Sequence, residues 1–438
     1  MDVLVLGARV VSVELAKELE RTFPATEFTN EVRHVRRLEK VRALEKNIPR
    51  KIREGEIMDA TTKTEQNPLK ELARFGQSPW LDYIRRDLFT TGELKRLIET
   101  DGLKGMTSNP AIFEKAIGSE HYKDSIAKLA LEEGASAVSL YEKLAIEDIQ
   151  TAADALAVVY DETKMRDGYV SLEVSPALAD DSEGTLEEAR RLWKAVNRPN
   201  LMVKVPATAV GFDTIKQLIS EGININVTLL FAQESYAKVA EAYVAGVEKR
   251  AAEGKDLSNV ASVASFFVSR IDSLIDSQIE EKLKDASGEE KELLENLRGK
   301  VAIANAKMAY QTYEEIFSGE RWEKLAEKGA QTQRVLWAST GTKNADYSDV
   351  LYIEELIGKD TVNTIPPATW DAFRDHGKLR NSLTEDVEEA KETLANLEKA
   401  GISLKDATDK LLVDAVRLFV EPFDKMIAAV EKAIGEKK

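Results

Sequence analysis

From residue 67 onward, the chain carries short apolar runs, each bounded by polar or turn-forming residues. The runs are short for a helix and rich in β-branched and aromatic residues, so the pattern predicts buried strands. Eight such runs occupy residues 80–83, 105–108, 169–174, 201–205, 223–231, 260–268, 334–339 and 361–365.

Longer segments with apolar residues at helical spacing lie between the runs, among them residues 136–158, 186–195, 235–252 and 302–317. Eight strands alternating with helices predict an α/β fold whose strands close into a (β/α)8 TIM barrel, an architecture of about 250 residues. The remaining length predicts extra helices at residues 282–297 and 321–329 and in a tail from 384 to 434.

The first 57 residues read as a separate small α/β appendage. A buried strand ending at Gly7 is followed by helical spacing over residues 12–23 and by a basic run from Arg33 to Arg42. One strand and two helices bury little core on their own. The polar stretch from Met58 to Asn67 is typical of a linker, so we place the domain boundary between residues 57 and 58.

Composition narrows the classes of function. The chain has 438 residues, 43% hydrophobic and 32% charged, and a formal net charge of −16 without a long basic block, which argues against a nucleic-acid partner. It contains no cysteine and three scattered histidines, His34, His121 and His376, so a metal site built on these residues is not expected. Neither a membrane-spanning apolar run nor a signal peptide is evident, which favours the cytoplasm. The sequence leaves open whether the protein is a monomer or a homodimer.

Lys204 stands in the middle of the apolar run Leu201–Val205. Desolvation disfavours the ammonium form of a lysine in a barrel interior, and a neutral amine can attack a carbonyl and form a Schiff base. Two plainer readings are open from this residue alone. The side chain could reach out to solvent at the strand end, or it could form a structural ion pair.

Polar residues recur at the carboxyl ends of most predicted strands, which is where barrel active sites lie. They are Asp82, Asn109, Glu173, Lys204, Asn226, Thr228, Ser265, Arg270, Ser339 and Lys343. Each also has an ordinary structural reading, such as a helix cap for Asn109, small core residues for Thr228 and Ser265, and a surface ion pair for Arg270. Polar groups repeated at one end of so many strands nevertheless indicate a site, because burying them there is costly unless they are used.

At this point a resemblance becomes specific, because residues 67–438 resemble a transaldolase of the longer type. It is carried by Gln77-Ser78-Pro79-Trp80-Leu81-Asp82, Thr107-Ser108-Asn109-Pro110, Ser171-Leu172-Glu173-Val174, Val203-Lys204-Val205-Pro206-Ala207-Thr208, Asn226-Val227-Thr228-Leu229-Leu230-Phe231 and Ser265-Phe266-Phe267-Val268-Ser269-Arg270. The resemblance implies reversible transfer of a dihydroxyacetone unit between sugar phosphates, with no cofactor.

The resemblance also implies roles. Lys204 would form the Schiff base, and Glu173 would act as general acid and base through a water held with Thr228. Asp82 would move the proton of the substrate hydroxyl during carbon–carbon cleavage. The dihydroxyacetone hydroxyls would be held by Asn109, Asn226 and Ser265, and the sugar phosphate by Arg270 and Ser339. Shorter transaldolases have an arginine two residues after that serine; here the position is Gly341, and Lys343 is the candidate replacement, as a point charge without the bidentate fork.

Residues 1–57 resemble the C-terminal part of a B-type ribose-5-phosphate isomerase. The resemblance rests on Leu6-Gly7-Ala8-Arg9-Val10-Val11, Glu14-Leu15-Ala16 and Arg33-His34-Val35-Arg36-Arg37, with Arg33 and Arg37 matching phosphate-binding positions. The catalytic part of that fold is not in the chain, so we interpret the segment as a non-catalytic remnant. For the barrel, two alternatives to a transaldolase stay open: a Schiff-base aldolase that releases free dihydroxyacetone, and a catalytically dead sugar-phosphate-binding protein.

Overall fold

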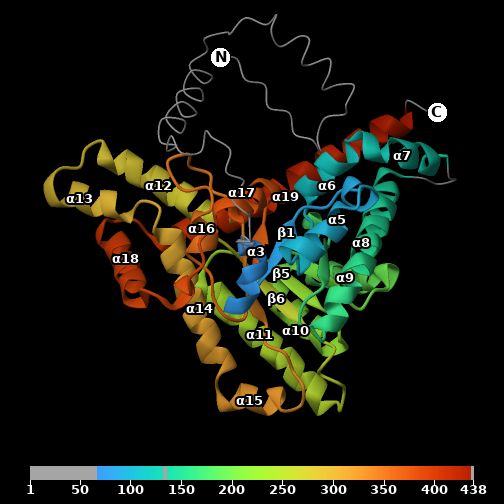
Figure 1. Cartoon of the computed structure of the whole chain (residues 1–438), viewed down its shortest axis with the longest axis horizontal. Coiled ribbons are helices and arrows are strands. Elements are labelled where there is room, and N and C mark those ends of the chain that lie inside the picture. The colour runs from blue at the N-terminus through green and yellow to red at the C-terminus, as the bar shows by residue number, and fades with distance from the viewer. Residues whose placement is uncertain (1–66, 132–135, 436–438) are drawn as a thin grey trace, which may run out of the picture. The chain divides into compact units, whose positions relative to one another are not determined.

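The computed structural model describes residues 67–131 and 136–435 (Figure 1). The chain divides into two units, Met1–Glu65 and Gln66–Lys438, and everything described below belongs to the second. The predicted appendage of residues 1–57 and its boundary at Met58 lie outside the described residues.

Eight parallel strands form one closed barrel in chain order, as the alternating pattern predicted. They are β1 (Gln77–Asp82), β2 (Gly105–Thr107), β3 (Tyr169–Glu173), β4 (Leu201–Pro206), β5 (Ile225–Leu230), β6 (Ser262–Phe267), β7 (Arg334–Ala338) and β8 (Thr361–Ile365). The barrel closes where β1 pairs with β8, from Gln77 opposite Thr361 to Leu81 opposite Ile365. The (β/α)8 fold is thereby confirmed.

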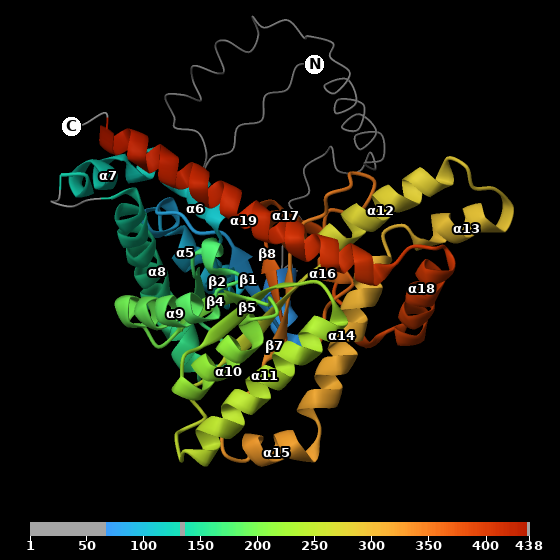
Figure 2. The ribbon, with the colours of Figure 1, turned by 180° about the vertical axis from the view of Figure 1, so that it is seen from behind.

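Helices surround the barrel and connect its strands (Figures 1 and 2). The longer ones are α6 (Pro110–Ile117), α8 (Ala137–Glu162), α9 (Ser182–Val196), α10 (Gly211–Glu221), α11 (Gln233–Ala252), α12 (Ser269–Leu283), α13 (Gly288–Leu297), α14 (Val301–Phe317), α17 (Pro367–His376), α18 (Val387–Lys399) and α19 (Leu404–Gly435). Shorter ones are α3 (Pro68–Glu71), α4 (Asp87–Thr90), α5 (Glu93–Arg96), α7 (Lys123–Leu129), α15 (Glu320–Ala326) and α16 (Leu351–Glu354).

The extra helices lie close to where they were predicted, with two differences. The segment predicted at 282–297 is split, because α12 ends at Leu283 and α13 begins at Gly288. The predicted tail is likewise two helices, α18 and α19, separated around Gly401, whose φ of +69° ends the first helix at a backbone conformation that glycine adopts without strain.

A buried polar cluster fills the end of the barrel where the strands begin. Arg334 pairs with Asp167 at 2.8 Å and also donates to the Ser78 hydroxyl at 2.8 Å. The ring of Trp80 lies beside this pair, and a Cβ on Gly105 would come within 2.5 Å of it, so β2 starts with a residue that has no side chain. Removing one partner of such a buried pair typically costs about 3–5 kcal/mol. Because Ser78 belongs to this cluster, β1 begins at Gln77 rather than at the predicted residue 80.

The C-terminal helix α19 crosses the end of the barrel where the strands finish, and Figure 2 shows it as the long diagonal helix. It packs against α6 and α8, which both lie between β2 and β3, and against α12, which follows β6. The tail therefore covers the end of the barrel where active sites of this fold lie.

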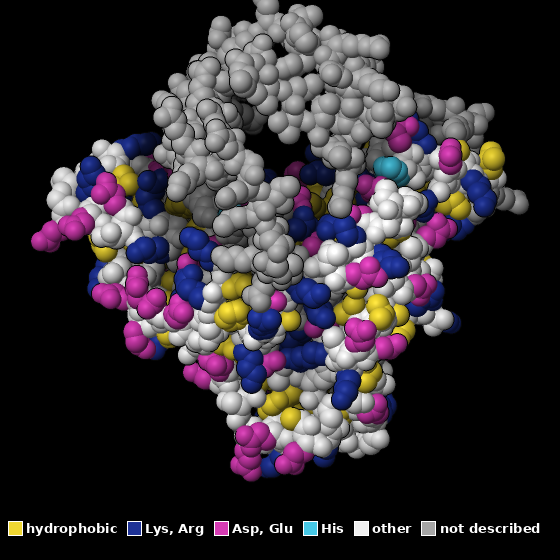
Figure 3. All heavy atoms as spheres, viewed as in Figure 1, with side chains coloured by type: hydrophobic (Ala, Val, Ile, Leu, Met, Phe, Trp, Pro, Cys, Tyr) yellow, Lys and Arg dark blue, Asp and Glu magenta, His cyan; other side chains and the backbone are white. Residues whose placement is uncertain are grey.

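Side chains of both charge signs are interspersed on the part of the surface that Figure 3 shows for the described residues. No helix between residues 67 and 435, leaving aside 132–135, combines the length and the apolar content needed to cross a membrane.

Candidate active site

A cavity of about 460 Å³ opens at the carboxyl ends of the strands, and we name it the strand-end cavity. It receives side chains from most of the strands and from α6, α12 and α19. Among its lining are eight residues singled out from the sequence: Asp82, Asn109, Lys204, Thr228, Ser265, Arg270, Ser339 and Lys343. Glu173 and Asn226 are not part of this lining, but each is within contact of a residue that is.

Lys204 is 5% exposed, and its side chain points into the barrel. Its Nζ donates to the Ser108 carbonyl at 3.0 Å and lies 3.4 Å from Oε2 of Glu173. Strand register produces this arrangement, since Lys204 pairs with Glu173 of β3 on one side and with Asn226 of β5 on the other. The burial rules out a lysine that reaches out to solvent. The ion pair with Glu173 exists, and it lies beside the cavity.

Two carboxylates, Asp82 and Glu173, flank the lysine in different surroundings. Burial raises the pKa of Asp82, while the positive charges of Lys204, Lys343 and Arg270 pull that pKa back down. Burial also raises the pKa of Glu173, Lys204 lowers it, and the negative charge of Asp82 raises it again. Carboxyl groups with raised pKa values suit proton transfer near neutral pH.

The polar side chains deeper in the barrel form a chain of hydrogen bonds. Ser265 Oγ donates to Oδ1 of Asn226 at 2.7 Å, and Nδ2 of Asn226 donates to Oγ of Ser171 at 3.0 Å. These bonds fix the amide of Asn226 with its nitrogen toward β3 and its oxygen toward β6. The network therefore joins β3, β5 and β6, and it passes Lys204 on the intervening strand β4.

Thr228 lines the strand-end cavity at a point where β5 is irregular. The register between β5 and β6 shifts between Val227 and Leu230, and Leu229 has a φ of +64°. The Thr228 hydroxyl is fully buried and has no hydrogen-bond partner among the described residues. A strained backbone that holds an unpartnered hydroxyl at a cavity wall is typical of functional sites.

Asn109 serves as the N-cap of α6, with its Oδ1 accepting from the Ile112 amide at 3.0 Å. The interpretation of Asn109 as a helix cap is thus confirmed for its side-chain oxygen. Its side chain also lines the strand-end cavity, which leaves the amide nitrogen as the group that can face a ligand there.

Positive charge gathers on the side of the cavity formed by β6, β7 and α12. Arg270 lies in the first turn of α12, its Cζ is 5.2 Å from the ring centre of Phe267, and its buried NH1 has no partner among the described residues. Burial lowers the pKa of Arg270. Ser339, held at a φ of +57°, places its Oγ 2.9 Å from that of Ser269. Together with the exposed Lys343 and the positive end of α12, these groups can hold an anion.

Some lining residues were missed from the sequence, notably Lys115, Tyr83 and Phe419. Lys115 could have been found, because it follows Ala111 by one helical turn on the helix that Asn109 caps. No sequence signal marks Phe419, whose ring centre lies 5.9 Å from Lys204 Nζ, since its place depends on how α19 packs. Within the described residues, His, Asp and Glu side chains form no group of three or more that could hold a metal ion.

A closed parallel barrel that gathers a lysine, two carboxylates and cationic groups at the carboxyl ends of its strands defines a (β/α)8 barrel enzyme. Residues 79–430 match the family described as Transaldolase/Fructose-6-phosphate aldolase, and the chain belongs to this family.

Curated relatives are similar over nearly their whole length. The transaldolase of Trichodesmium erythraeum is 48% identical over 371 residues, which cover 84% of this chain and 98% of that protein. Transaldolase 2 of Nostoc punctiforme is 48% identical over 374 residues, with 84% and 98% covered. The transaldolase of Thiobacillus denitrificans is 46% identical over 365 residues, with 83% and 99% covered. These findings support transaldolase function, and hence an enzyme, for this chain.

Proposed function

We propose that the chain transfers a dihydroxyacetone unit reversibly between sugar phosphates through a Schiff base on Lys204, converting sedoheptulose 7-phosphate and glyceraldehyde 3-phosphate into erythrose 4-phosphate and fructose 6-phosphate. The observation that carries this proposal is the buried Lys204 amine, 3.4 Å from the Glu173 carboxyl and lining one cavity with Asp82.

In the first step Lys204 passes a proton to Glu173 across their ion pair, and the resulting neutral amine attacks the C2 carbonyl of the ketose and forms a carbinolamine. Glu173 then gives its proton to the C2 hydroxyl, which leaves as water, so that a protonated imine and a Glu173 carboxylate remain. The two charges formed lie within ion-pair distance of each other, which favours this step in a buried site. We assign the Thr228 hydroxyl to hold this water, because it is buried and has no hydrogen-bond partner among the described residues.

In the second step the bond between C3 and C4 breaks, and its electron pair moves into the protonated imine. Asp82 takes the proton of the C4 hydroxyl as the aldehyde forms, and returns it when the next aldehyde adds. A protonated imine supplies the electron sink that this cleavage requires. Burial raises the pKa of Asp82 and three nearby cations lower it. A carboxyl group under these two opposing effects is suited to take up a proton and release it again.

Binding roles follow from the lining and from the hydrogen bond that joins Asn226 to Ser265, which is part of it. We propose that Asn109, Asn226 and Ser265 hold the hydroxyls of the dihydroxyacetone unit, and that Arg270, Ser339 and Lys343 hold the phosphate. The unpartnered NH1 of Arg270 supports the phosphate assignment, because a buried donor without a partner is costly unless a ligand meets it.

An aldolase that releases free dihydroxyacetone would use the same lysine and carboxylates, and the family description covers both activities. The relatives reported above are all named as transaldolases, which favours transfer. A dead binding protein is disfavoured by the retained set Asp82, Glu173 and Lys204. The cytoplasmic location and the lack of a nucleic-acid partner stay predictions.

The proposal is tested by adding borohydride to the protein with fructose 6-phosphate, in parallel with an assay of transfer to erythrose 4-phosphate. We expect transfer, and a reduced dihydroxyacetone adduct on the peptide that carries Lys204. Free dihydroxyacetone formed faster than transfer product would favour the aldolase. Absence of both products and of any adduct would favour the binding protein.

We expect activity to be independent of metal ions, because the sequence has no cysteine and its three histidines are scattered. The measurement is the transfer rate after prolonged treatment with a chelator. A loss that added zinc or magnesium restores would contradict this expectation.

We further propose that residues 1–57 are dispensable for transfer and have no isomerase activity. The relatives are matched over nearly their full length by about 84% of this chain, and the family match begins at residue 79. A chain beginning at Met58 should therefore keep its kcat/KM. A fall of more than about tenfold, or about 1.4 kcal/mol, would show that the segment contributes to the site. Conversion of ribose 5-phosphate to ribulose 5-phosphate by the full chain would show that the segment is active.

A further inference from the structure

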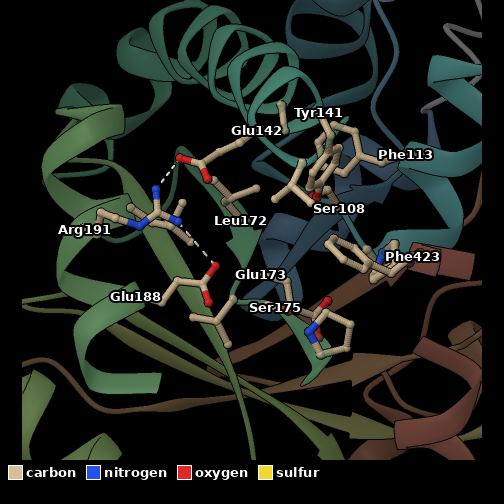
Figure 4. Close-up of a pocket in the computed structure, with 17 residues that line it drawn as sticks. Ser108, Phe113, Tyr141, Glu142, Leu172, Glu173, Ser175, Glu188, Arg191 and Phe423 are labelled. Carbon is tan, nitrogen blue, oxygen red and sulfur yellow. Dashed lines mark hydrogen bonds and ion pairs between the residues drawn. The ribbon is translucent and has the colours of Figure 1, made fainter. Parts of the chain in front are cut away.

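A second cavity, of about 230 Å³, lies beside the barrel between α6, α8, α9 and α19, and we name it the side cavity (Figure 4). Phe113, Tyr141 and Phe423 form one wall, with edge-to-face contacts at 5.8 and 5.5 Å between ring centres. On the opposite side Arg191 bonds to Glu142 and Glu188, as the dashed lines in Figure 4 show. This volume could hold several water molecules, at about 30 Å³ each.

The side cavity reaches the protein surface at one end and Glu173 at the other. Val138 and Arg191, which both line it, are about half exposed, at 49% and 50%. Glu173 lines the side cavity and not the strand-end cavity in the described structure, although its Oε2 lies 3.4 Å from Lys204. Its carboxyl group therefore lies between the reactive amine and a second space that opens to solvent, and Asn109 lines both spaces.

One face of α19 closes both spaces. Phe419 lines the strand-end cavity near Lys204, and Phe423, one turn later, lines the side cavity. A sugar phosphate bound to Lys204 and to the cations around Arg270 would occupy the strand-end cavity between these groups. Water released at Lys204 forms next to Glu173, and the side cavity that Glu173 lines is a space that this substrate does not occupy.

We propose that the side cavity is a water compartment that serves Glu173 while substrate fills the strand-end cavity, an inference that rests on the proposed Schiff base. Imine formation converts the amine, the C2 carbonyl and the protonated Glu173 into the imine cation, the Glu173 carboxylate and one water molecule. Hydrolysis consumes one water molecule and reverses each of these changes. Water passes between this step and bulk solvent through the side cavity, past Ser108 and Ser175 toward Arg191.

Exchange of oxygen isotope measures this route directly. With fructose 6-phosphate and erythrose 4-phosphate in water enriched in oxygen-18, each exchange of the released water before imine hydrolysis places the heavy isotope on C2 of the ketose. The readout is the ratio of label incorporated at C2 to dihydroxyacetone transferred, corrected for exchange without protein. This ratio reports water movement rather than overall rate.

Ala145→Met, on α8, places a longer side chain in the side cavity, and we expect it to lower the ratio by about threefold or more. Ala155→Met makes the same substitution on the exposed face of the same helix and should leave the ratio unchanged. Arg191→Ala opens the outer end and should raise the ratio. Arg190→Ala is its matched control, because Arg190 pairs with Glu221 and does not line the side cavity.

An unchanged ratio in folded Ala145→Met and Arg191→Ala protein would overturn the water compartment. If borohydride still labelled Lys204 in those samples, the proposed function would stand. Should Ala145→Met not fold, the comparison of Arg191→Ala with Arg190→Ala decides on its own, since both residues are on the surface of α9. Without isotope incorporation and without an adduct on Lys204 in the unaltered protein, both the inference and the Schiff-base mechanism fail.

Discussion

Lys204→Met should abolish transfer, lowering kcat/KM by at least about 10⁴-fold, or roughly 5.5 kcal/mol of transition-state stabilisation. Methionine keeps the length and packing of the side chain but removes the amine that the mechanism needs. The amine is buried beside Glu173 and donates to the Ser108 carbonyl. Among the described residues, the other lysines that line the strand-end cavity, Lys115 and Lys343, are exposed.

The measurement is the rate of transfer from fructose 6-phosphate to erythrose 4-phosphate, with mass analysis after borohydride treatment. Lys194→Met is a suitable control, because Lys194 is exposed on α9 away from the strand-end cavity. The variant Lys204→Met should carry no adduct and melt cooperatively. Activity within about tenfold of the unaltered protein, or an adduct on a different lysine, would rule out the assignment.

Glu173→Gln and Asp82→Asn should fail at different steps, each slowing its step by about 10²–10⁴-fold. Glutamine keeps the size of Glu173 but cannot give a proton to the leaving hydroxyl, so formation of the adduct should be slow. Asparagine at position 82 leaves imine formation intact but cannot take the C4 hydroxyl proton, so adduct should form and accumulate uncleaved.

The dependence on pH provides a second readout for Glu173. Burial raises the pKa of its carboxyl, so the protonated form that drives dehydration persists above the usual range and is lost as pH rises through that raised value. The unaltered protein should therefore form the adduct more slowly as pH increases past this point, and Glu173→Gln should lack that decline. Both are followed by quenching with borohydride at successive times, with Glu187→Gln on the exposed side of α9 as control. Equal trapping and turnover in Glu173→Gln, Asp82→Asn and the unaltered protein would refute both roles.

The barrel could be predicted from sequence because its strands are buried on both faces, which makes them read as continuous apolar runs. The same rule placed the start of β1 too late, since Gln77 and Ser78 are polar. They are tolerated because Gln77 donates to the Leu356 carbonyl and Ser78 joins the pair of Arg334 and Asp167. These partners lie far away in the sequence, so no local pattern reveals them.

The candidate site was predictable to the extent that it lies at strand ends. Asp82, Lys204 and Ser265 lie toward the carboxyl ends of their predicted strands, so they could be placed at the same end of the barrel. The contribution of Phe419 and Phe423 on α19 could not be predicted. The amphipathic pattern of a helix shows which of its faces is buried, but it does not show which part of the protein that face packs against. The position of Glu173 between two cavities likewise depends on α6 and α8 from one connection, α9 from the next and α19 from the tail.

The order in which the chain leaves the ribosome bears on when the reactive lysine is enclosed. Lys204 is synthesised in the first half of the chain, but β8, which closes the barrel against β1, ends only at Ile365. Phe419, which lies over the amine, comes later still. During translation the strands β1 to β4 are therefore synthesised before β8 can pair with β1 and close the barrel. Because these paired strands lie far apart in the sequence, their contact forms slowly. A nascent chain arrested before α19 would expose Lys204 to whatever carbonyl compounds are present, and the unspecific adducts expected there would distinguish a half-made barrel from a finished one.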